Sequence, residues 1–133
     1  MDTTSISVPT SSQVEFVDVT GQIRRFIADS KIASGVCWAF VPHTTAGITI
    51  NEGADPSVQA DIIAHLAAMV PASSSFSHQE GNSPAHIKAS IVGSSVSVFV
   101  EKGRLILGTW QAIYLCEFDG PRTRRLLLKI STQ

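Results

Sequence analysis

The chain has 133 residues, of which 44% are hydrophobic and 16% are charged, and its formal net charge is -1. This size and composition predict one globular domain, residues 1–133, that buries roughly two thirds of its unfolded surface. A near-neutral charge provides no general attraction for nucleic acid, so we expect no nucleic-acid partner. No apolar run approaches the ~20 residues that cross a bilayer, and no basic segment with an apolar core begins the sequence. We therefore expect a cytoplasmic protein with no membrane partner.

Strand and helix signals alternate through the first half of the sequence. Residues 14–16 alternate with the period of a strand, and Thr20 can cap a helix whose apolar side chains at 23–27 share one face. Residues 35–41 are continuously apolar, which is typical of a strand covered on both faces. Residues 48–50 alternate again and predict a further strand.

The second half begins with a well-marked helix. Asp55 is a good N-cap, and Pro56 suits the first helical position of a helix that Pro71 ends. Ser83-Pro84 repeats this cap-and-proline start for a shorter helix.

Strand signals fill the remainder of the chain. Residues 96–100 alternate apolar and polar side chains, and Glu101-Lys-Gly103 predicts a hairpin turn into residues 104–118. A final strand covers 126–130. The whole pattern predicts an α+β domain with about seven strands, in antiparallel or mixed sheets in a sandwich-like arrangement, and about three helices. Several of these strands would form sheet edges that need a cover, and oligomerisation is one way to supply it.

The cysteines and the basic residues near the C-terminus are interpreted as structural. Cys37 and Cys116 lie inside apolar strand-like runs without metal-site spacing, so we interpret both as reduced core residues. Near the C-terminus, Arg124, Arg125 and Lys129 are interpreted as the solvated surface of a strand.

The segment Gly103-Arg-Leu-Ile-Leu-Gly-Thr-Trp-Gln111 places unusual polar groups inside strand-like sequence. An indole and an amide can donate hydrogen bonds, and glycine permits the close approach of a ligand or another backbone. A bulged strand with a packed tryptophan is an equally good explanation of this segment alone.

The four histidines differ in their sequence contexts. His65 lies in the apolar periodicity of a helix, so we interpret it as structural and leave it out of the site. His43 follows a buried strand, where loops gather, while His78 and His86 flank a glycine-containing loop and a helix start. Neutral imidazole binds zinc-like metals, and imidazole also moves protons near neutral pH. Pattern alone leaves capping, core hydrogen bonding and solvent exposure open for each of the three.

Seven short motifs, in order and spacing, resemble the YjbQ-like family, also described as secondary thiamine-phosphate synthases. The resemblance covers residues 18 to 130, and residues 1–12 match weakly. The motifs are His43-Thr-Thr-Ala-Gly, Asn51-Glu52, Asp55-Pro56, Glu80-Gly-Asn82, Ala85-His86-Ile-Lys88, Gly108-Thr-Trp-Gln111 and Asp119-Gly-Pro-Arg122.

The resemblance implies a homotrimer with a histidine-lined pocket at or near a subunit boundary. Carried over residue by residue, it makes His43, His78 and His86 a candidate catalytic or metal-binding cluster, with Glu80 as the base or as the carboxylate that orients an imidazole. The metal would be divalent, zinc or magnesium. The candidate substrate- and phosphate-binding residues are Thr44, Asn51, Glu52, Asn82, Lys88, Arg104, Thr109, Trp110, Gln111, Asp119 and Arg122.

The residues themselves support an anion site. The segment 81–86 begins a helix, whose free N–H groups favour an anion, and Lys88, Arg104 and Arg122 can complement a phosphate. Each of these three also has the alternative of a surface ion pair. No Walker or dinucleotide-binding glycine pattern is present. We therefore expect a small phosphorylated substrate.

Three hypotheses follow for the function. The first is a transferase that joins a thiazole phosphate to a pyrimidine diphosphate and releases pyrophosphate. The second is a metal-dependent hydrolase of a small phosphorylated compound, and the third is a non-catalytic metabolite- or metal-binding trimer. The first rests on the resemblance, and the sequence does not separate it from the second.

Overall fold

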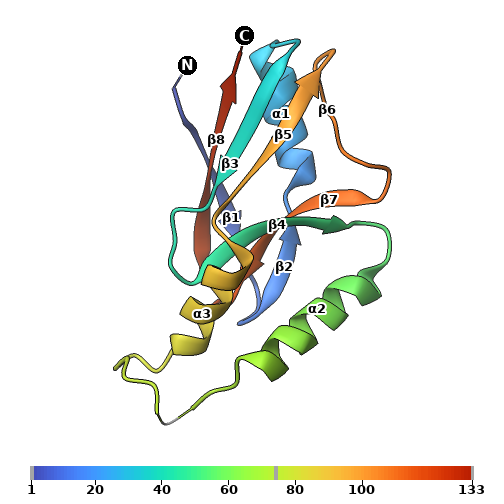
Figure 1. Ribbon diagram of the computed structural model, residues 1–133. Helices are drawn as coiled ribbons and strands as arrows, with labels where there is room; N and C mark the ends of the chain where they lie inside the picture. The colour runs from blue at the N-terminus through green and yellow to red at the C-terminus, as the bar shows by residue number, and fades with distance from the viewer. Residues whose placement is uncertain (1, 74, 133) are drawn as a thin grey trace.

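A computed structural model describes residues 2–73 and 75–132 of the protein (Figure 1). Eight strands and three helices are formed by these residues. They are β1 Thr4–Pro9, β2 Glu15–Asp18, α1 Thr20–Ser30, β3 Gly35–Phe40, β4 Ala46–Glu52, α2 Pro56–Met69, α3 Ser83–Val92, β5 Ser95–Glu101, β6 Arg104–Leu105, β7 Gln111–Glu117 and β8 Thr123–Ser131. The predicted α+β class and the three helices are confirmed.

The strands form two sheets, and every strand pair in the described ranges is antiparallel. The larger sheet has the order β1-β8-β3-β5-β6, and the smaller has the order β2-β7-β4. In Figure 1 the start of β1 and the end of β8 lie close together, because β1 and β8 are antiparallel neighbours in the larger sheet. Of the two predicted alternatives, antiparallel and mixed sheets, the described strand pairs therefore agree with the antiparallel one.

The main core lies between the two sheets and α1. Alternating residues of β8 and β5, such as Leu128 and Val100, turn inward from the larger sheet, and Ile48 and Leu115 meet them from the smaller one. Ile23 and the rest of the apolar face of α1 join the same core. This two-sheet core is what the alternating patterns in the sequence predict.

The opposite face of the smaller sheet is covered by α2 and α3, which lie together at one end of the molecule in Figure 1. Tyr114, Cys116 and Phe118 pack there against Leu66 of α2 and Ala85 of α3. Strand β7 is thus buried on both faces, and only its first residue is exposed. That double burial explains its continuous apolar run.

The helix starts follow the sequence signals with two corrections. Asp55 is confirmed as the N-cap of α2, since its carboxylate accepts a hydrogen bond from the N–H of Ser57 at 3.0 Å. Thr20, predicted to be a cap, is instead the first residue of α1, and the Asp18 carboxylate accepts from its N–H at 2.9 Å. Ser83 was also predicted to be a cap, but α3 has Asn82 in that position.

The observed strands differ from the prediction of about seven strands in two places. The pattern missed β1, which pairs along its whole length with β8. It treated residues 104–118 as one strand-like segment, whereas the short β6 and the long β7 lie in different sheets. The predicted hairpin turn is present between β5 and β6, with positive φ at Lys102 (52°) and Gly103 (73°).

The outer face of the larger sheet carries large apolar side chains. Trp38 and Phe40 of β3 are 50% and 44% exposed, and Phe99 of β5 is 66% exposed. The register places Phe40 beside Leu127 and Val36 beside Phe99, so these side chains share one face. We call these five residues the apolar outer face.

Both cysteines are free and buried, as predicted. Burial raises the pKa of the Cys37 thiol to about 11 and also raises that of Cys116. In the described part of the chain, no helix has the length and apolar character needed to cross a membrane.

Candidate active site

Two of the predicted histidines meet at the start of α3. His86 lies on the first turns of α3, and His78 lies in the loop before it. Their ring centroids are 5.1 Å apart, with the ring planes at 89°. The Nε2 atom of His78 lies 4.0 Å from a carboxylate oxygen of Glu80. Three of the four predicted catalytic residues therefore form one cluster, which we call the histidine cluster.

A hydrogen-bonded bridge joins the same helix start to the turn between β7 and β8. The Nδ2 amide of Asn82 donates to Oδ2 of Asp119 at 2.9 Å, and Nη2 of Arg122 contacts that same oxygen at 3.1 Å. The Nε of Arg122 also donates to the Asp119 carbonyl at 2.8 Å. Three predicted substrate-binding residues are thus held together, although Asn82 and Asp119 are 37 residues apart in the sequence.

A cavity of about 470 Å³ lies between α2, α3 and the chain that follows β7. Its lining includes Glu80 from the histidine cluster, Asn82 and Asp119 from the bridge, and Lys88 from α3. Phe118 and the end of α2 supply apolar wall. A small molecule in this cavity would contact charged groups on one side and apolar groups on the other.

His43 lies in the connection between β3 and β4, outside the ring pair of His78 and His86. Its Nε2 atom accepts a hydrogen bond from the backbone N–H of Arg125 at 2.9 Å. Partial burial lowers its pKa below the ordinary value, and the nearby positive charge of Arg124 lowers it further. His43 is therefore a neutral imidazole with one nitrogen already used.

Arg124, interpreted from the sequence as solvated, is buried. Its guanidinium forms an ion pair with Glu117, and both side chains are almost completely enclosed. The hydroxyl of Thr45 accepts from Nη2 of Arg124 at 2.8 Å, and Thr10 donates to Glu117 at 2.8 Å. The sequence interpretation was wrong because the side chain of Arg124 lies on the buried face of β8. Its partner, Glu117, belongs to another strand, so the sequence around Arg124 gives no sign of the pair.

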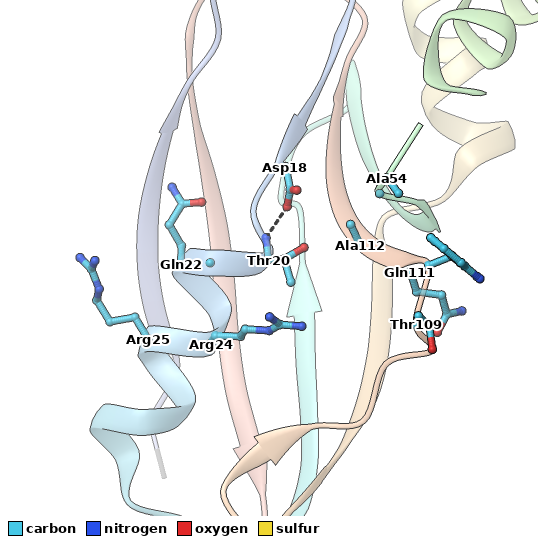
Figure 2. A pocket seen from close by; sticks show the side chains of 12 residues that line it. Asp18, Thr20, Gln22, Arg24, Arg25, Ala54, Thr109, Gln111 and Ala112 are labelled. Carbon is cyan, nitrogen blue, oxygen red and sulfur yellow. Dashed lines mark hydrogen bonds between the residues drawn. The ribbon is translucent and has the colours of Figure 1, made fainter. Parts of the chain in front are cut away.

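Three other predicted residues lie at the opposite end of β7. Thr109, Trp110 and Gln111 line a cavity of about 770 Å³ together with Arg24 and Arg25 of α1. Figure 2 shows Arg24 extending from α1 in the direction of Thr109 and Gln111, whereas Arg25 points to the other side. The Trp110 carbonyl accepts from the N–H of Gly53 at 2.7 Å, which fixes this loop against the end of β4.

Four further predicted residues lie outside the 470 Å³ cavity. Asn51 and Glu52 lie at the end of β4, where the Tyr114 hydroxyl donates to the Glu52 carbonyl at 2.9 Å. Arg104 lines a separate cavity of about 390 Å³ with Arg24. Thr44 is exposed in the same connection as His43. None of these four lines the cavity beside the histidine cluster, and neither do His78, His86 or Arg122.

The length of β7 separates the two groups. Gln111 begins this strand and Glu117 ends it, and six steps of about 3.3 Å place the two ends roughly 20 Å apart. One small substrate in a single subunit would therefore contact one group only. His65 is exposed on α2 and lines neither cavity.

The described residues do not form a three-ligand metal centre. No group of three or more His, Cys, Asp or Glu side chains within them is placed to hold an ion. Zinc sites in proteins use three or four such ligands, and here Nε2 of His43 already accepts a hydrogen bond. A metal at His43, His78 and His86 therefore stays a prediction.

Sequence reasoning missed several residues at these sites. Glu117 and Arg124 were obscured because a buried ion pair between two strands has no local pattern. Arg24 and Arg25 had a weak signal, since two adjacent basic residues follow the start of α1.

Comparison with known proteins gives consistent matches over the whole chain. The sequence profile of the family described as "UPF0047 protein YjbQ-like" matches residues 4–133. A UPF0047 protein of Methanocaldococcus jannaschii is 50% identical over 92% of this chain and 89% of its own length. The UPF0047 protein YugU of Bacillus subtilis is 47% identical over 95% of this chain and 96% of its own.

Solved structures agree with the fold. A crystal structure of an uncharacterised conserved protein of the YjbQ/UPF0047 family from Clostridium acetobutylicum is similar with a TM-score of 0.94. It is 48% identical, and the match covers 96% of this chain and 99% of that one. A YbjQ-like protein of unknown function from Sulfolobus solfataricus has a TM-score of 0.93 at 35% identity, over 99% of this chain and 97% of that one. These descriptions name no activity.

Proposed function

Because this chain belongs to the YjbQ-like family, also described as UPF0047, we propose that it is a small-molecule transferase of the secondary thiamine-phosphate synthase type. It joins a thiazole phosphate to a pyrimidine diphosphate at the histidine cluster and releases pyrophosphate. The ring nitrogen of the thiazole forms the new C–N bond, while the C–O bond to the diphosphate breaks and the leaving group takes the electron pair.

One observation carries the proposal. The paired rings of His78 and His86 lie at the same helix start as the Asn82–Asp119–Arg122 bridge, beside a cavity of about 470 Å³. A proton donor beside the departing pyrophosphate and a fixed guanidinium that stabilises anionic oxygen would both assist this reaction. The proposal draws its reaction from the family resemblance and its location from this arrangement.

Each group has a defined part. His86 is half-buried and rigid on α3, so we assign it the transfer of protons to the departing pyrophosphate. Arg122 is 52% exposed at its side chain and is oriented by Asp119, so it can contact phosphate oxygens without rearrangement. No step in this assignment requires a metal.

We also propose that the protein is a homotrimer. The apolar outer face exposes Trp38, Phe40 and Phe99 on one side of the larger sheet, and such a patch is typical of a subunit interface. In an assembly, the Thr109–Gln111 loop of one subunit could reach the histidine cluster of another, although the two are far apart within one chain.

Complementation tests the proposal in cells. A bacterial strain that lacks its main thiamine-phosphate synthase is supplied with this protein, with His86→Ala, or with His65→Ala as the matched control. We expect growth without thiamine from the wild type and from His65→Ala, and loss of growth with His86→Ala at equal protein levels. Absence of growth with all three would favour a hydrolase or a non-catalytic binding protein.

A further inference from the structure

Lys88 is a buried cation that has no charged partner in the part of the chain that the structure describes. It lies on the inward face of α3 with Ala85 and Ala89, and only 7% of it is exposed. None of the ion pairs formed by the described residues involves it, and its ammonium lies 5.9 Å from the centroid of the Phe118 ring. Burying a charge without an opposite charge is costly, so such a group usually has a partner.

A second unpartnered group lies at the start of the same helix. The Oδ1 atom of Asn82 is buried and, within the described residues, accepts no hydrogen bond. Its orientation is fixed by chemistry, because the Nδ2 amide donates to the Asp119 carboxylate, which only accepts. Buried polar atoms in folded proteins nearly always have a partner.

Both residues line the same cavity. Lys88 and Asn82 line the 470 Å³ cavity, where the other charged groups are Glu80 and Asp119. Asp119 is already paired with Arg122 at 3.1 Å, and Glu80 is 74% exposed at its side chain and lies 4.0 Å from His78. Within residues 2–73 and 75–132, the lining of this cavity therefore includes one buried cation and one buried acceptor that have no ionic or hydrogen-bonding partner.

We propose that Lys88 and Asn82 are the anchor of the substrate, and that the ligand is a small phosphate ester that carries an N–H donor. The phosphate accepts hydrogen bonds from the Lys88 ammonium, and the N–H group donates to Oδ1 of Asn82. This inference rests on the proposed function in taking the ligand to be a substrate. It adds which substrate group each residue recognises.

The first test uses inorganic phosphate as the probe. Calorimetry is performed on the wild type, on Lys88→Met, which keeps an apolar stem beside Phe118, and on Lys129→Met, which removes the same charge from an exposed position. Loss of a charge-assisted hydrogen bond predicts roughly 10- to 100-fold weaker phosphate binding in Lys88→Met and no change in Lys129→Met. Lys88→Met should also melt at the same or a higher temperature without phosphate, because an uncompensated buried charge is removed.

The second test examines whether an N–H donor on the ligand binds Oδ1 of Asn82. Phosphoethanolamine and ethyl phosphate carry the same anion, and only the first has an amine. We expect the wild type to bind phosphoethanolamine more tightly, and Asn82→Ala to lose that preference while it still binds ethyl phosphate. Equal binding of the two probes by the wild type would overturn the role of Asn82.

The results separate this inference from the proposed function. Equal phosphate affinity in the wild type and Lys88→Met, or no phosphate binding by either, would overturn the anchor even if the protein makes thiamine phosphate. Lys88-dependent binding in a protein that makes no thiamine phosphate would support the anchor and refute the reaction.

Discussion

The backbone N–H of Arg125 donates a hydrogen bond to Nε2 of His43 at 2.9 Å. This bond requires an unprotonated Nε2, so the neutral ring carries its proton on Nδ1. His43 can therefore offer a ligand an N–H donor and no free lone pair. That role differs from the roles of His78 and His86, whose rings contact each other at the N-terminal end of α3.

The protonation of His43 gives the first prediction. Partial burial and the charge of Arg124 lower its pKa, so the NMR titration of its ring in metal-free protein should have a midpoint below 6.5. Because the folded state disfavours the proton, the stability that depends on neutral His43 is complete above pH 6.5. It is lost as the pH falls from there through the folded pKa. His43→Gln should remove this part of the pH dependence, and a midpoint above 6.5 would contradict the geometry.

For the buried pair of Arg124 and Glu117, we predict that removing one partner destabilises the protein more than removing both. Arg124→Met leaves the Glu117 carboxylate without its charged partner and should reduce the free energy of unfolding by about 3–5 kcal/mol. Replacing both residues by methionine should cost clearly less than Arg124→Met alone. Urea unfolding of the single and double variants measures both, and additive effects would show that the pair is not coupled.

Acid should weaken the same pair. Burial alone would raise the pKa of Glu117, but hydrogen bonds from Arg124, the Asp119 N–H and Thr10 outweigh it and hold the pKa below 4.5. The stability contributed by ionised Glu117 is therefore present above pH 4.5 and is lost as the pH falls through the folded pKa. Thermal unfolding between pH 6 and pH 3 should show a smaller decline for Glu117→Gln than for the wild type.

The sequence predicted local features better than distant pairings, and these residues show why. Asp55-Pro56 starts α2 as expected, because a cap and the helix that it starts are neighbours in the chain. The pairing of Arg124 with Thr45 spans 79 residues, and no local pattern encodes it. Strand β1 was missed although Ile6 and Val8 alternate with serines, because two apolar positions make only a short pattern.

The candidate site shows the same division. The motifs identified His78, Glu80 and His86, which the fold brings together. They did not show that Trp110 lies at the other end of β7, because distance along a strand emerges only once the sheets are assembled.

The buried thiols predict chemical inertness. Burial raises the pKa of Cys37 to about 11 and that of Cys116 as well, so neither supplies thiolate near neutral pH. Iodoacetamide at pH 8 should label neither cysteine in the native protein and both after denaturation, as measured by intact mass. Rapid native labelling of Cys116 would show that the core beside α3 opens readily.

Assembly through the apolar outer face is tested by native mass. We expect three subunits at low micromolar protein, and dissociation when Trp38→Glu places a charge in the interface. Met69→Glu is the matched control, since Met69 is 55% exposed on α2, away from that face. A wild-type monomer would contradict the assembly, and an intact Trp38→Glu trimer would place the interface elsewhere.

The most direct test of the account is catalysis by the purified protein. Thiazole phosphate and pyrimidine diphosphate are supplied with and without added Mg²⁺, and thiamine phosphate and pyrophosphate are measured together over time. We predict that the two products appear in equal amounts, that His65→Ala matches the wild type, and that His86→Ala is slower by roughly 100-fold or more. No thiamine phosphate from the wild type, or an unchanged rate with His86→Ala, would contradict the assignment of this reaction to the histidine cluster.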